Sequence, residues 1–174
     1  NIAASLGIMG YKVLIIDLDP QGNTTSGAGI SKKTLKGSTK ELLNGSLPLS
    51  DIMVSTAYQN LDVIPTNTAL AGAEFDLFDC EDSEFRIKTA LAEVKDNYDY
   101  ILIDCPPSLG MLTINAFAAS DGVIVPMQCE FYALEGLSQL TVTINRIKAN
   151  FNPNLNITGI LITMYNSRLL LSLQ

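Results

Sequence analysis

The chain has 174 residues and a formal net charge of −7, a length typical of one domain at roughly 100–200 residues per domain. Apolar residues make up 47% and charged residues 17% of it, which excludes a disordered tail or a collagen-like repeat. No apolar run approaches the roughly 18 residues of a membrane span, and the first residues lack the basic region of a signal peptide. The acidic balance argues against a wholly basic nucleic-acid module, although it allows a local basic patch.

The histidine and cysteine content excludes further kinds of site. The chain contains no histidine, so His-based triads and His-ligated zinc sites are excluded from this stretch. Its three cysteines, Cys80, Cys105 and Cys129, are odd in number and form no CxxC pair. We therefore expect reduced thiols, as in a cytosolic protein.

The first half of the chain alternates predicted helices and strands. Residues 1–9 are small and apolar and predict a helix that ends before Gly10. Residues 12–17 (KVLIID) predict a strand buried on both faces of a parallel sheet, and residues 18–30 predict a loop. A capping box at Ser38 and Glu41 predicts a helix that ends at Gly45. A second strand, 61–65, and a helix, 67–78, follow.

The second half continues the same alternation. It predicts helices over 82–95, 111–119 and 134–149, and strands over 100–105, 122–126 and 157–162. Strands that alternate with helices require crossover connections. The sequence therefore predicts an α/β fold with three layers, in which helices flank a mostly parallel twisted sheet. We expect residues 1–174 to form a single domain, because no repeat or linker interrupts them.

Two of the predicted strands end in acids followed by turn residues. The first continues as DLDPQGN over residues 17–23, and the third as DCPPSLG over residues 104–110. Ligands of open parallel sheets bind at the carboxyl ends of the strands. Carboxylates there can hold Mg²⁺ directly or through water and can orient an attacking water. The glycine-containing turns beside them can approach phosphates or move when a phosphate leaves.

An aliphatic strand before DLDPQGN, combined with a second strand that closes in DCPPSLG, resembles the ParA/Soj branch of the deviant Walker-type P-loop ATPases. The segments VIVPMQCEFYALEGL and GILITMYNSRLLLS resemble later strands and loops of that family. The similarity thus covers essentially the whole chain. It implies a P-loop NTPase-like fold, with ATP and Mg²⁺ as cofactors.

The resemblance also implies a role for individual residues. Asp19 would orient the water that attacks the γ-phosphate, with Asp17 near the metal and the P-loop lysine, so both are catalytic candidates. Asp104 matches the Walker B acid, which holds Mg²⁺, usually through water. Arg168 falls where chromosome-associated relatives place a DNA-contacting arginine, although an exposed structural arginine is an equal reading. The nucleotide-sensing switch residues would be Pro20, Gln21, Gly22, Asn23, Pro106, Pro107, Ser108 and Gly110.

The family's phosphate-binding loop is a GKGGVGKT-like segment before the first helix. No GxxxxGK[ST] pattern occurs in this chain. Because the chain opens inside a predicted helix without a Met, we expect a fragment that lacks the P-loop and the C-terminal part. We expect the longer protein to hydrolyse ATP and the fragment alone to be inactive.

The function that this resemblance implies is DNA partitioning. ATP would promote a homodimer that binds DNA non-specifically, and a ParB/Spo0J-like partner would stimulate hydrolysis and release. We expect a cytoplasmic, nucleoid-associated protein without membrane binding. A MinD-like ATPase that binds membrane through a C-terminal helix is one alternative, and DPQGN with CPPSLG favours the ParA branch over it. A non-catalytic scaffold of the same fold is another, against which the intact Asp19 and Asp104 argue.

Overall fold

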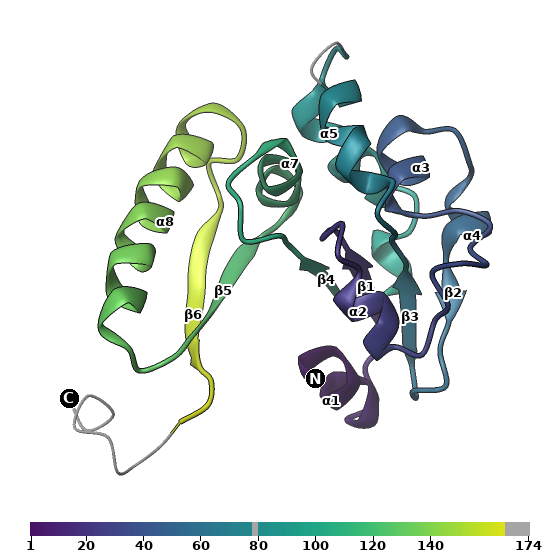
Figure 1. Ribbon diagram of the computed structural model, residues 1–174, viewed down its shortest axis with the longest axis horizontal. Helices are drawn as coiled ribbons and strands as arrows, with labels where there is room; N and C mark the ends of the chain where they lie inside the picture. The colour runs from purple at the N-terminus through teal and green to yellow at the C-terminus, as the bar shows by residue number, and fades with distance from the viewer. Residues whose placement is uncertain (78–79, 166–174) are drawn as a thin grey trace. The chain divides into compact units, whose positions relative to one another are not determined.

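The strands of the first part of the chain form one mixed sheet in the order β2-β3-β1-β4 (Figure 1). In the computed structural model, which describes residues 1–77 and 80–165, β1 pairs in parallel with both β3 and β4. The short β2 runs antiparallel to β3 and was not predicted. The bounds are β1 Val13–Asp17, β2 Val54–Ser55, β3 Leu61–Ile64 and β4 Tyr100–Asp104. The predicted α/β class with a mostly parallel sheet is confirmed for this part.

Both faces of β1 are covered. On one face, Val13 packs with Ala3 of α1 (Ile2–Ile8) and with Leu61 of β3. Successive strand residues point to opposite faces, so Leu14 and Ile16 lie on the other face, where both are fully buried. This burial explains the unbroken aliphatic run, because a strand covered on both sides carries apolar residues at every position.

The helices of this part connect the strands. The predicted capping box is present: the backbone N–H of Ser38 donates to Glu41 Oε2 at 2.8 Å, and Gly45 ends the helix in the left-handed region at φ +67°. The short helices α2 and α4 were not predicted, because each has barely one turn and no apolar periodicity. The helices are α2 Asn23–Gly27, α3 Thr39–Asn44, α4 Leu49–Ile52, α5 Leu70–Leu77, α6 Arg86–Leu91 and α7 Met111–Ala119.

The helix predicted over 82–95 is divided in the structure. It becomes a 3₁₀ turn, η1 (Ser83–Phe85), then α6, then a second 3₁₀ turn, η2 (Lys95–Asn97). The buried side chain of Asn115 explains the first break. Its Nδ2 donates to Ser83 O at 2.7 Å, and its Oδ1 accepts from Ile87 N at 3.3 Å. A continuous α-helix would join these two backbone groups to each other, so Asn115 replaces that bond.

The chain divides into two compact units, Asn1–Ala116 and Phe117–Gln174. In the second unit, β5 (Gly122–Met127) and β6 (Asn156–Ile162) form a parallel two-stranded sheet. The helix α8 (Phe131–Asn150) connects them, as the sequence predicted. Asn152 ties the turn after α8 to its own unit, because its Nδ2 donates to the carbonyls of Phe117 and Ser120 at 2.9 and 2.7 Å. Within the described part of the chain, no helix has the length and apolarity needed to cross a bilayer.

Candidate functional site

The two predicted acids Asp17 and Asp104 lie opposite each other on neighbouring strands. They are register partners in the parallel β1–β4 pair, and each is the last residue of its strand. The pairing continues one step further, because Leu18 N donates to Asp104 O at 2.8 Å. The structure therefore brings the DLDPQGN and DCPPSLG segments out at one edge of the sheet, as the strand-end argument predicted. Their position on neighbouring strands comes from the strand order, which the sequence did not predict.

Asp17 is fully buried and its carboxylate is held by three donors. Oδ2 accepts from the backbone N–H and the hydroxyl of Thr25 at 2.7 and 2.6 Å, and Oδ1 accepts from Asp19 N at 3.3 Å. Burial raises the pKa of Asp17, the bonds from Thr25 and Asp19 oppose this, and the nearby Asp104 adds a smaller rise. The Thr25 hydroxyl in turn accepts from Thr66 N at 2.9 Å. Asp17 thus anchors the following loop to the core.

The loop after β1 is organised around Asp19 and Gly22. Asp19 Oδ1 accepts from Gln21 N at 2.9 Å, and Gly22 N donates to Asp19 O at 2.8 Å. Gly22 has φ +63°, a conformation that favours glycine. Lys32 Nζ donates to Gln21 O at 2.7 Å and so fixes the loop from outside. Asp19 and Pro20 are half-buried, whereas Gln21 and Asn23 are exposed, so the side chain of Asp19 is more accessible than that of Asp17.

Asp104 differs from Asp17 in its surroundings. It is half-buried, and its Oδ2 accepts from the hydroxyl of Thr24 at 2.6 Å. Thr24 lies in α2, within the segment for which the sequence predicts a loop. The only sequence signal for it was its place directly after DPQGN. The neighbouring Cys105 is held as a thiol, because burial and then the charge of Asp104 raise its pKa to about 12.

The donor set at Asp104 and Thr24 is compatible with magnesium. Magnesium prefers oxygen ligands, keeps several waters and is commonly bound by one or two carboxylates together with substrate phosphates. Asp104 and Thr24 offer a carboxylate and a hydroxyl. Among the described residues, no group of three or more His, Cys, Asp or Glu could enclose a metal ion. The site thus fits an ion completed by water and phosphate oxygens.

The second predicted loop, residues 106–110, follows β4 directly. Pro107 and Ser108 are exposed, whereas Pro106 and Gly110 are half-buried. Ser108 O accepts from the hydroxyl of Thr113 at 2.6 Å, which holds the loop to α7. Both predicted switch segments thus leave the sheet at the same edge, and each has its own ties to the core. Arg168, the predicted DNA contact, lies outside the described residues.

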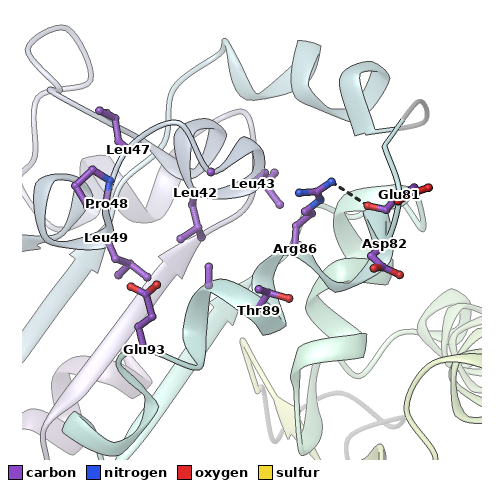
Figure 2. A pocket seen from close by; sticks show the side chains of 12 residues that line it. Leu42, Leu43, Leu47, Pro48, Leu49, Glu81, Asp82, Arg86, Thr89 and Glu93 are labelled. Atoms are coloured by element: carbon purple, nitrogen blue, oxygen red, sulfur yellow. Dashed lines mark hydrogen bonds between the residues drawn. The ribbon is translucent and has the colours of Figure 1, made fainter.

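Two cavities among the described residues of the first unit differ in their relation to the acids. One, of about 320 Å³, is lined by Asn1 and Ala4 of the first helical segment and by Asn23 and Thr24 of α2, among others. It places the start of the chain beside the residue that binds Asp104. The other, of about 610 Å³, contains none of the predicted site residues and lies between α3 and α6 (Figure 2). There, Arg86 Nη2 donates to Glu81 O at 2.9 Å.

Comparison with known proteins identifies the family. The sequence model of a family described as an AAA domain matches residues 1–157. The chain is 50% identical to the sporulation initiation inhibitor protein Soj of Bacillus subtilis, over 100% of this chain and 69% of that protein. It is 48% identical to the chromosome partitioning protein ParA of Myxococcus xanthus, over 97% of this chain and 59% of that protein.

A solved structure gives the same result for the fold. The cobyrinic acid a,c-diamide synthase of Mycobacterium smegmatis with bound ATP analogue and magnesium is 41% identical, with a TM-score of 0.93 over 98% of this chain and 70% of that one. The chain spans about two thirds of the length of the curated relatives that it matches. On this sequence identity, the chain belongs to the ParA/Soj family of partitioning ATPases.

Proposed function

We propose that the full-length protein is a magnesium-dependent ATPase that partitions DNA in the manner of the ParA/Soj family. The observation that carries the proposal is the side-by-side exit of the Asp19 and Asp104 segments from neighbouring parallel strands. Sequence identity of 48–50% to Soj and ParA supports the family task. The magnesium and ATP analogue bound to the M. smegmatis protein support the choice of cofactors.

Asp104 and Asp19 have separate roles in this proposal. Asp104, oriented by the Thr24 hydroxyl, holds magnesium directly or through water. A bound magnesium ion supplies positive charge that neutralises the phosphates. Asp19, half-buried at the loop turn, orients the water that attacks in line with the leaving group. Asp17 acts indirectly, because its buried carboxylate fixes the loop that carries Asp19.

The family resemblance implies a phosphate-binding loop directly before the first helix of the fold. The cavity that joins Asn1 to Asn23 and Thr24 supports this part of the proposal, because such a loop would then enter beside Asp104. Residues 20–23 and 106–110 would contact the nucleotide from the two strand ends. Loss of a phosphate would release them, which provides a route from hydrolysis to partner affinity.

DNA binding and partner control complete the proposed cycle. We assign to the full-length protein an ATP-dependent homodimer, non-specific DNA as ligand, a ParB/Spo0J-like stimulator and a cytoplasmic, nucleoid-associated location. The name of the M. xanthus relative, a chromosome partitioning protein, supports DNA as the ligand. With a chain charge of −7, DNA contact would depend on local basic residues that face phosphates, and affinity would fall steeply with added salt.

The central test is ATP turnover by the full-length protein and its Asp19→Ala variant. We expect magnesium-dependent hydrolysis in the wild type. The variant should bind ATP, measured with a fluorescent analogue, but lose at least about a hundredfold in turnover, because the attacking water is no longer oriented. Undiminished hydrolysis in the variant would refute the role of Asp19. Sedimentation with liposomes in place of DNA would favour the MinD-like alternative, and absence of ATP binding would favour the scaffold.

A further inference from the structure

A carboxylate outside the acidic site holds the end of the 106–110 loop. Glu74 Oε1, on α5, accepts a hydrogen bond from the backbone N–H of Met111 at 2.7 Å. Met111 is the first residue of α7, and the first N–H groups of a helix have no partner within the helix. Negative charge is favoured at this end of a helix dipole. Because α7 has no acid in its own first turn, Glu74 supplies one from a different helix.

The residue before Met111 is small enough to admit this carboxylate. A Cβ atom placed on Gly110 would overlap Glu74 Oε1. The backbone of Gly110 is not among the glycines with positive φ, so space rather than backbone conformation accounts for a glycine here. Gly110 and Glu74 therefore form a matched pair: the missing side chain of one makes room for the carboxylate of the other.

The same loop is tied to α7 at a second point. The buried Thr113 donates its hydroxyl to Ser108 O at 2.6 Å. Thr113 thus fixes the loop to α7, and Glu74 fixes the start of α7 to α5. The middle of the loop, from Pro107 to Leu109, is exposed. The loop is thus held through the backbone groups of Ser108 and Met111, while residues 107–109 stay accessible to a ligand.

We propose that Glu74 is a positioning residue for the 106–110 loop, holding it through the N-terminus of α7 in the place from which it contacts the nucleotide. The catalytic part of this inference rests on the proposed ATPase function. The structural part, that Glu74 orders residues 108–112, is independent of it.

The experiment compares Glu74→Ala, Glu74→Gln and Asp76→Ala in the full-length protein. Asp76 is an exposed acid of the same helix and controls for the lost charge. In Glu74→Ala, backbone amides 108–112 should exchange hydrogen faster, and kcat should fall about tenfold while KM for ATP changes by less than about threefold. Glu74→Gln keeps a carbonyl acceptor, so its hydrogen exchange and its kcat should both be close to those of the wild type. Asp76→Ala should match the wild type.

Gly110→Ala tests the same contact without changing charge. Its methyl group should displace Glu74 and reproduce the faster exchange and lower kcat of Glu74→Ala. The double variant should be no worse than either single one, because the contact can be lost only once. If Glu74→Ala fails to fold, Gly110→Ala and Glu74→Gln still test the contact.

Two results separate the inference from the proposed function. Unchanged exchange at residues 108–112 in both Glu74→Ala and Gly110→Ala would overturn the positioning role, whatever the turnover. Faster exchange in a full-length protein that hydrolyses no ATP would support the positioning role and refute the proposed function. Faster exchange with unchanged kcat in an active enzyme would overturn the catalytic part alone.

Discussion

Asp17 and Asp104 are register partners on adjacent parallel strands, yet their carboxylates have different surroundings. Asp17 is fully buried and held by Thr25, whereas Asp104 is half-buried and bound by Thr24. Two consecutive threonines of α2 thus hold the two acids at the strand ends. This arrangement leaves one carboxylate enclosed and the other partly accessible, and it yields predictions for each threonine.

Thr24→Val should weaken magnesium binding. Its hydroxyl donates to Asp104 Oδ2 at 2.6 Å, and loss of a group that orients a metal-binding side chain typically costs about 10–100-fold in metal affinity or activity. The measurement is the magnesium concentration that gives half-maximal ATP turnover in the full-length protein. Thr24→Ser retains the hydroxyl and should stay near the wild type. An unchanged magnesium requirement in Thr24→Val would show that Thr24 does not orient Asp104.

Thr25→Val should destabilise the fold. The variant keeps the shape of the side chain but removes the hydroxyl that donates to Asp17 Oδ2 and accepts from Thr66 N. Leaving buried polar groups unpaired costs about 1–3 kcal/mol each, so the free energy of unfolding should fall by at least about 1 kcal/mol in denaturant titrations. Thr25→Ser is the matched control and should lose less. Equal stability of Thr25→Val and the wild type would contradict the anchoring role of Asp17.

The stability contribution of Asp17 should depend on pH. Burial raises its pKa above the ordinary value of 3.8, so the folded state holds this proton more tightly than the unfolded chain does. The contribution is therefore fully present below about pH 3.8 and is lost as pH rises through the raised pKa. The free energy of unfolding of the wild type, minus that of Asp17→Asn, should therefore decrease as pH rises over this range.

Denaturant titrations of both proteins at several acidic pH values measure this difference. Subtracting the variant removes the titration of the other carboxyl groups, which the two proteins share. Asp96→Asn, which changes an exposed side chain, provides the control for a general charge effect. A difference that grows in favour of the wild type with rising pH would reverse the sign and refute the raised pKa.

Gly22→Ala should cost more stability than Gly45→Ala. Both glycines have φ near +65°, at +63° and +67°, where a Cβ costs about 1–2 kcal/mol. A Cβ at Gly22 would also lie 2.8 Å from Lys32 Cδ, whereas one at Gly45 meets nothing within 4 Å. The larger loss of unfolding free energy at Gly22 should come with weaker ordering of the loop after β1, visible as faster hydrogen exchange. Equal losses of unfolding free energy at both positions would mean that the Lys32 side chain moves aside without destabilising the fold.

The sequence by itself determined most of the local elements and the common edge at which the two acids lie. Aliphatic runs, the Ser38 capping box and glycine at helix ends depend on neighbours within a few residues, so their patterns can be read directly. The placement of Asp17 and Asp104 at one edge of the sheet followed as well, because parallel strands bring their carboxyl ends to the same edge. That their strands are neighbours was decided by the strand order of the folded sheet.

Only the tertiary structure decided which residues hold those acids and loops in place. The Thr24–Asp104 bond joins residues 80 positions apart, and the Glu74–Met111 bond joins residues 37 positions apart. Asn115 divides the helix predicted over 82–95 by taking up two backbone groups that lie 32 and 28 positions away. Such hydrogen bonds leave no periodic signal, because they depend on the packing of segments that are distant along the chain.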